Sequence, residues 1–189
     1  MSCMPRSFII KNTRSYGKGV FASRMIPKGS VIHVLDGETV SLRELVTRLN
    51  AGIENIDDPL QIGKRTYLDL DELSRTFNHS CDPNAALRKR SELFALRDIP
   101  KGEQIAYDYS LTIAPTQWRM KCACGARTCR TILGDVLSIP KDQLATYRRQ
   151  GALQTYMRAL LNSIAHNGTY RIPTYETTYL KRLARTSNT

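Results

Sequence analysis

The chain has 189 residues, and 28 lysine and arginine side chains stand against 17 aspartate and glutamate side chains, which gives a net charge of +11. This length can bury one hydrophobic core without disulfide staples, and no apolar run approaches the ~20 residues that a membrane-spanning helix needs. Residues 1–8 lack the apolar stretch of a secretion signal. We therefore expect a reducing compartment: the cytoplasm, the nucleus, or a host nucleus if the protein is an effector.

Short apolar segments separated by glycine- and proline-containing turns dominate the first 110 residues and predict a β-rich core. Ser41 and Glu44 form a capping-box pattern, and the apolar residues that follow lie on one helical face, so we expect one short helix before Gly52. Residues 53–64 are polar and are typical of a loop. The predicted strands are 7–10, 20–22, 31–35, 66–70, 93–97 and 104–109.

Beyond Gly134 the pattern becomes helical. Ser138 and Pro140 are helix-start signals, apolar residues then recur at roughly helical spacing, and Gly151 is an expected break between two helices. We therefore divide the chain into a core of residues 1–134, whose last part is about 112–134, and a helical extension with a basic tail, residues 135–189. The last ten residues are expected to be mobile.

An odd number of cysteines without a secretion signal favours a metal site or free thiols over disulfides. The five cysteines are Cys3, Cys81, Cys122, Cys124 and Cys129. Three of them form a CxC pattern followed, after four residues, by a third cysteine, and such crowding of thiols is typical of tetrahedral zinc. Zinc needs a fourth ligand, for which Cys81 is the candidate apart from Cys3. A free-thiol or redox cluster is the alternative.

Asn78-His79-Ser80-Cys81, paired with this downstream cysteine cluster, resembles the SET-domain protein lysine methyltransferases that carry a post-SET zinc motif. Tyr16 to Ala22 looks like the N-terminal GxG segment of that family, and Gly102 to Tyr109 looks like its closing strand. The resemblance covers roughly residues 7–134. It implies a mostly β SET fold with short helices, in which the segment after the closing strand forms a pseudoknot beneath the loop before Asn78, followed here by C-terminal helices.

The resemblance also implies roles for individual residues. Tyr109 would be the catalytic tyrosine of the lysine channel, and Tyr107 would occupy the position that limits how many methyl groups fit. Binding of S-adenosyl-L-methionine would fall to Gly17, Lys18, Gly19, Asn78, His79 and Tyr109. Zinc would be held by Cys81, Cys122, Cys124 and Cys129.

One departure from the family pattern and one matching position bear on specificity. Leu35 and Asp36 stand where many members of the family carry an aromatic residue, so one wall of the lysine channel is either missing or supplied from elsewhere. The tyrosine at position 107 favours mono- or dimethylation, because its hydroxyl leaves less room for further methyl groups. Arg75 either anchors the Asn-His-Ser loop or is a surface cation.

We therefore expect S-adenosylmethionine-dependent methylation of lysine in a protein substrate, a histone or another basic protein. One alternative is a non-catalytic SET-like module that binds protein or nucleic acid, and another is a zinc-dependent nucleic-acid binder. The positive charge suggests contact with nucleic acid that accompanies the substrate. A locally acidic groove is the other way to receive a basic substrate, and its candidate residues are Asp57, Asp58, Asp69, Asp71 and Glu72. The oligomeric state stays open.

Overall fold

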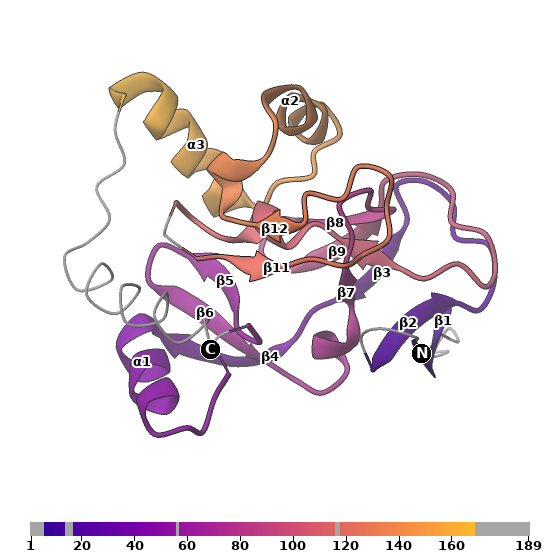
Figure 1. Ribbon diagram of the computed structural model, residues 1–189, viewed down its shortest axis with the longest axis horizontal. Coiled ribbons are helices and arrows are strands. Elements are labelled where there is room, and N and C mark those ends of the chain that lie inside the picture. Colours follow the sequence, from indigo (N-terminus) through magenta and orange to yellow (C-terminus); the bar gives the residue numbers. More distant parts are fainter. Residues whose placement is uncertain (1–5, 14–16, 56, 116–117, 169–189) are drawn as a thin grey trace, which may run out of the picture.

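The computed structural model describes residues 6–13, 17–55, 57–115 and 118–168, and Figure 1 shows how they are arranged. Cys3, Tyr16 and the tail expected to be mobile lie outside the described residues. The strands are β1 (Phe8–Asn12), β2 (Lys18–Ala22), β3 (Val31–Val34), β4 (Gly37–Ser41), β5 (Leu60–Gly63), β6 (Thr66–Leu70), β7 (Asn78–His79), β8 (Ala85–Arg88), β9 (Glu92–Ala95), β10 (Ala106–Tyr107), β11 (Met120–Lys121) and β12 (Ile132–Leu133). The helices are α1 (Leu42–Asn50), α2 (Lys141–Arg149) and α3 (Thr155–Asn167), with short 3-10 turns η1 (Ser74–Thr76), η2 (Tyr109–Thr112) and η3 (Val136–Ser138).

The strands form small sheets rather than one large sheet. β1 pairs with β2, β11 pairs with β12, and two three-stranded sheets have the orders β3-β9-β8 and β4-β6-β5. These pairs are antiparallel, whereas β7 and β10 are parallel. The fold class predicted from the sequence, mostly β with short helices, is therefore confirmed. Among the described residues, no helix combines the length and the apolar character needed to cross a bilayer.

Helix α1 begins as its sequence predicted. The Ser41 hydroxyl accepts a hydrogen bond from the Glu44 backbone N–H at 3.1 Å, which is one half of a capping box. The Glu44 carboxylate does not complete the box, because it accepts a hydrogen bond from Arg48. Arg48 also contacts Glu38 of β4 and Asp69 of β6, so it ties the helix to that sheet.

Some predicted elements were wrong or incomplete. Residues 60–63 were expected in a loop but form β5, whose first two residues are buried against β6. Pro59 directly precedes this strand, where a missing N–H costs little. In the predicted strand 104–109, residues 106–107 pair with β7 and Gln104 forms a single antiparallel bridge to Phe21, and the chain turns into η2 at Tyr109.

The sheet of β3, β9 and β8 separates two hydrophobic clusters. Ala85, Leu87, Leu93 and Ala95 face the main core, whereas Ala86 and Phe94, which alternate with them, face a second cluster. Helices α2 and α3 cover that second face through Tyr147, Met157 and Leu161. In Figure 1 these helices lie on the opposite side of the molecule from α1. Gly151 separates α2 from α3 in a left-handed conformation, with φ of +70°.

Candidate active site and metal centre

The parallel pairing of β7 with β10 brings two of the predicted motifs side by side. Asn78 lies opposite Ala106, and His79 lies opposite Tyr107. The pairing continues at Ser80, whose backbone N–H donates to the Tyr107 carbonyl at 3.1 Å. The Asn-His-Ser segment and the segment that ends in Tyr109 are therefore held together by backbone hydrogen bonds over most of their length.

A cavity of about 130 Å³ opens beside this pair of strands. It is lined by tyrosines that include both predicted catalytic residues, by Phe77, and by one tryptophan. The aromatic lining residues are Tyr67, Phe77, Tyr107, Tyr109 and Trp118, and the charged ones are Asp57, Asp58 and Arg75. An apolar, aromatic wall with few polar groups is typical of a binding site for one extended side chain.

The two tyrosines have different environments. Tyr109 donates its hydroxyl hydrogen to the Phe77 carbonyl at 2.9 Å, which fixes the ring against the cavity. Tyr107 is buried, and burial raises the pKa of its phenol, so its hydroxyl stays protonated. The two rings lie 4.9 Å apart between centroids and are tilted by 50°. Tyr107 and Tyr109 together therefore form one wall of the cavity.

The GxG segment lies against Asn78. The Asn78 side-chain amide donates to the Lys18 carbonyl at 3.1 Å. A Cβ atom on Gly19 would lie 2.9 Å from Asn78 Nδ2 and 2.7 Å from Gln104 Nε2, so this position has no room for a side chain. Gly17 has φ of +66° and open space around its Cα, and it therefore supplies a left-handed turn that leaves its surroundings clear.

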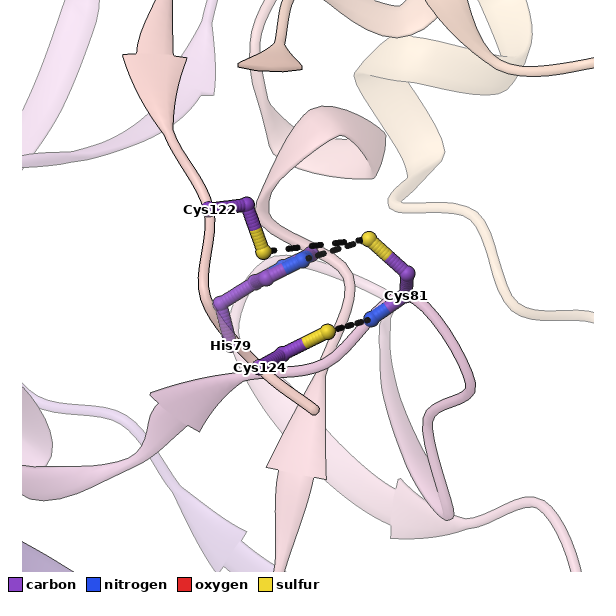
Figure 2. Close-up of side chains that lie close together, drawn as sticks. All are labelled: His79, Cys81, Cys122 and Cys124. Atoms are coloured by element: carbon purple, nitrogen blue, oxygen red, sulfur yellow. Dashed lines mark hydrogen bonds between the residues drawn. The ribbon is translucent and has the colours of Figure 1, made fainter. Parts of the chain in front are cut away.

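The predicted metal ligands lie near the end of β7, and Figure 2 shows three of them, Cys81, Cys122 and Cys124, together with His79. The Sγ atoms of Cys81 and Cys122 are 3.9 Å apart, and those of Cys122 and Cys129 are 3.7 Å apart. The Cys81 N–H points at Cys124 Sγ at 3.5 Å. Zn–S bonds of about 2.3 Å in a tetrahedron place two sulfur atoms about 3.8 Å apart, so these spacings fit zinc.

His79 also reaches this cluster. Donor atoms of His79, Cys81, Cys122 and Cys124 lie within 4.8 Å of one another. His79 Nδ1 accepts a hydrogen bond from the Tyr109 backbone N–H at 3.2 Å. Burial, with the nearby Arg130 charge, lowers the pKa of His79 to about 3, so the ring is neutral and its one proton sits on Nε2. Nε2 faces Cys81 Sγ, 3.2 Å away, and Cys129 Sγ lies 3.7 Å from Cys122 Sγ, so His79 and Cys129 are both candidates for the fourth ligand position.

The thiols of the cluster differ in pKa. Burial opposes ionisation of Cys124, but the N–H groups of Cys81 and Ala126 outweigh that effect and lower its pKa to about 7. Burial raises the pKa of Cys81 and of Cys122. A bound cation would deprotonate these thiols, because metal binding requires the thiolate.

Four positions take roles that sequence reasoning missed or left open. Tyr67 and Trp118 line the cavity, while Leu35, at the position of the expected aromatic wall, is buried in the main core. The alternation of the predicted strand 66–70 could have pointed to Tyr67, but nothing in the sequence pairs Trp118 Nε1 with Asp57, 3.2 Å away. Arg75 binds the Leu70 carbonyl and Asp58, so it anchors the loop beside the cavity.

The acidic candidates separate into two groups. Asp57 and Asp58 line the cavity. Asp69 contacts Arg48 and Arg75, Asp71 accepts the Ser74 N–H, and Glu72 pairs with Lys18. The carboxylates nearest the cavity are therefore those of Asp57 and Asp58.

The β-rich fold, the tyrosine-lined cavity and the cysteine cluster are those expected of a SET-domain protein, and comparison with known families agrees. Residues 17–110 match the family model of the SET domain, so the protein contains a SET domain, as its motifs predicted. The methyltransferase domain of human histone-lysine N-methyltransferase SETMAR has the same fold, with a TM-score of 0.57 and 24% identity over 68% of this chain and 58% of that chain.

Three curated relatives illustrate the comparison, and two of them are named as histone-lysine N-methyltransferases, one as putative. The chain is 36% identical over 137 residues to a variant-silencing SET domain-containing protein of Plasmodium falciparum, covering 64% of this chain and 5% of that protein. It is 33% identical over 143 residues to mouse histone-lysine N-methyltransferase NSD3, covering 69% and 10%. It is also 33% identical over 135 residues to the putative histone-lysine N-methyltransferase ASHH4 of Arabidopsis thaliana, covering 65% and 38%. The chain thus spans well under half the length of these relatives.

Proposed function

We propose that this protein transfers a methyl group from S-adenosyl-L-methionine to a lysine side chain of a protein substrate. The observation that carries the proposal is the tyrosine-lined cavity beside the paired β7 and β10 strands. The SET domain and relatives named as histone-lysine methyltransferases support it. A non-catalytic binding module is less favoured, because relatives that match most of this chain are named as histone-lysine methyltransferases.

The cofactor would bind where the GxG segment meets β7. Gly17, Lys18 and Gly19 would offer backbone, while Asn78, His79 and Tyr109 would complete the site from the adjoining strands. The close packing at Gly19 keeps the Asn78 amide in place, and the open space at Gly17 leaves room for a ligand. S-adenosylmethionine supplies a methyl group on a positively charged sulfur, which a neutral amine can attack.

The target lysine would enter the cavity. Free lysine has a pKa of about 10.4, and an apolar, water-poor wall favours the neutral amine over the ammonium form. Tyr109 would orient the reacting groups from its fixed position on the Phe77 carbonyl. The Tyr107 hydroxyl would hold the amine or a water molecule, and the space it occupies favours mono- or dimethylation.

Zinc would be held by Cys81, Cys122, Cys124 and Cys129, as the sulfur spacings allow. Structural zinc of this kind has a closed, four-coordinate shell and takes no part in chemistry. Its proposed role is to fasten residues 122–130 to the end of β7, beside His79 and Tyr109.

The substrate class would be a histone or another basic, flexible protein. Asp57 and Asp58 outnumber Arg75, which pairs with Asp58, among the charged residues that line the cavity, and the remaining negative charge would attract a basic peptide despite the net charge of +11. The basic residues elsewhere on the chain would contact nucleic acid that accompanies the substrate. Such contact would weaken steeply as salt concentration rises.

The test is transfer of labelled methyl groups onto core histones, nucleosomes and a lysate of basic proteins. Tyr109→Phe removes one hydroxyl from the cavity, and Ser163→Ala removes an exposed hydroxyl on α3 as a matched control. We expect label on a protein substrate that falls at least about tenfold in Tyr109→Phe and not in Ser163→Ala. Equal labelling by all three proteins would contradict the proposed site.

A further inference from the structure

Helix α2 makes direct hydrogen bonds to the segment that carries the proposed metal ligand Cys81. Gln143 Nε2 lies 3.1 Å from the Cys81 carbonyl oxygen and 2.9 Å from the Tyr147 hydroxyl oxygen. A side-chain amide has two hydrogens, so it donates to both oxygens at once. The Tyr147 hydroxyl keeps its own hydrogen for a third partner, and the nearest acceptor is the Asp108 carboxylate, 3.5 Å away.

Asp108 is the point where these contacts meet the active site. It lies between Tyr107 and Tyr109 in the chain, and its side chain is fully buried. Arg130, which directly follows the proposed ligand Cys129, donates to Asp108 Oδ1 at 2.5 Å. The backbone N–H of Arg130 points at Cys81 Sγ at 3.4 Å. A buried carboxylate is costly unless it is paired and hydrogen-bonded, so Asp108 holds the partners that reach it in place.

The contacts of α2 therefore converge on two points, the Cys81 carbonyl and the Asp108 carboxylate. Both points lie next to the cysteine cluster, and Asp108 is covalently joined to both cavity tyrosines. Tyr147 is itself buried in the second hydrophobic cluster, which holds α2 against the sheet. Because these partners come from residues beyond the SET segment at 17–110, the SET segment alone cannot supply them.

We propose that α2 acts as a clasp on the metal centre, in which Gln143 and Tyr147 are positioning residues. Gln143 holds the segment at residues 78–82 through the Cys81 carbonyl, and Tyr147 contacts Asp108, which in turn binds Arg130 of the segment at residues 120–133. Through Asp108 they fix the cavity wall formed by Tyr107 and Tyr109. The proposal rests on the proposed function in taking the cysteine cluster as a zinc site and the cavity as the lysine site. The hydrogen bonds that define the clasp do not depend on either.

The experiment compares Tyr147→Phe, Gln143→Leu and the double variant with the unchanged protein. Tyr147→Phe removes only the hydroxyl and keeps the buried ring, and Gln143→Leu keeps the side-chain size. Lys141→Ala, an exposed residue at the start of the same helix, is the control. Hydrogen exchange followed by mass spectrometry reports the protection of each segment, and zinc transfer to a chelator reports how firmly the metal is held.

We expect amide exchange in residues 78–82 and 120–133 to be about tenfold faster in the double variant, with exchange in β1 and β2 unchanged. Zinc transfer to the chelator should quicken by a similar factor. Exchange at the original rate in both segments would overturn the clasp, and so would a uniform rise over the whole chain, which would mean that α2 only stabilises the fold. If the purified protein holds no zinc, the metal proposal fails, while the exchange comparison still decides the clasp; methyl transfer enters neither readout.

Discussion

At the scale of single residues, the two cavity tyrosines differ in what their hydroxyl groups contact. The Tyr109 hydroxyl donates to the Phe77 carbonyl, whereas Tyr107 lines the cavity and its hydroxyl makes no hydrogen bond to the described part of the chain. A hydroxyl that donates to a fixed carbonyl holds its ring in one orientation. A hydroxyl that faces the cavity instead determines how much room a substituted amine has.

Replacing Tyr107 by phenylalanine should raise the degree of methylation. The change removes one oxygen from the cavity wall and leaves the ring packed in the core, so a lysine that already carries methyl groups has more room. We expect the product to shift from mono- or dimethyl-lysine toward the next higher state. Mass spectrometry of the product peptide measures the shift, and an unchanged product distribution would contradict the assigned position of the hydroxyl.

Gly19 should be intolerant of even the smallest side chain. In Gly19→Ala the new methyl group would lie under 3.0 Å from the side-chain amides of Asn78 and Gln104, so these groups must move. We expect affinity for S-adenosylmethionine to fall by about tenfold or more, because the Asn78 amide leaves the Lys18 carbonyl. Calorimetric titration measures the affinity, and Gly63→Ala is the control, because Gly63 likewise has no positive φ and its new Cβ would come no closer than 3.4 Å to its neighbours.

At the scale of elements, the site is assembled where separate segments meet. The cavity wall is formed by the loop at residues 57–59, the start of β5, strand β6, the η1 turn, β10 with η2, and Trp118. Trp118 also contacts Asp57 and so links the segment before the cysteine cluster to the loop before β5. Loops positioned by short strands in this way allow substrate specificity to change while the paired strands β7 and β10 stay the same.

The cysteine loop allows a sharp test of which side chains bind the metal. Cys129→Ser removes a proposed ligand, whereas His79→Gln removes a ring that we infer to donate a hydrogen bond to Cys81. We expect about one zinc per chain in the unchanged protein and in His79→Gln, with weaker retention in the variant by about 10–100-fold. Cys129→Ser should lose most of its zinc. Elemental analysis measures the content, and the reverse pattern would make His79 the fourth ligand.

At the scale of the whole molecule, the C-terminal helices complete the fold by covering one face of the β8–β9 pair. Met157 of α3 is fully buried in that second cluster. Met157→Ala should lower the free energy of unfolding by about 2–5 kcal/mol, because the truncation leaves a cavity. Arg158→Ala, at the neighbouring exposed position, should change it by less than about 0.5 kcal/mol. Urea unfolding measures both, and similar values for the two variants would contradict the packing.

The sequence predicts much of this arrangement, and the missing parts have physical causes. Because zinc needs four ligands, the three clustered cysteines predicted a further ligand elsewhere in the chain. Its candidate, Cys81, lies beside Cys122. Ala85–Arg88 gave no strand signal because its alanines have low β-propensity, and the strand forms because both of its faces are buried. The proton position on His79 and the contact of Gln143 with Cys81 depend on tertiary geometry, which residue spacing does not encode.

The most direct test of the central claim is to locate the transferred methyl group. The protein is incubated with nucleosomes and S-adenosylmethionine that carries a deuterated methyl group, and the substrate proteins are then sequenced by tandem mass spectrometry. We predict deuterated methyl on the side-chain nitrogen of one or a few lysines, in the mono- or dimethyl state, and its loss with Tyr109→Phe. Deuterated methyl on arginine or another residue type, or a lysine signal unchanged in Tyr109→Phe, would contradict the account.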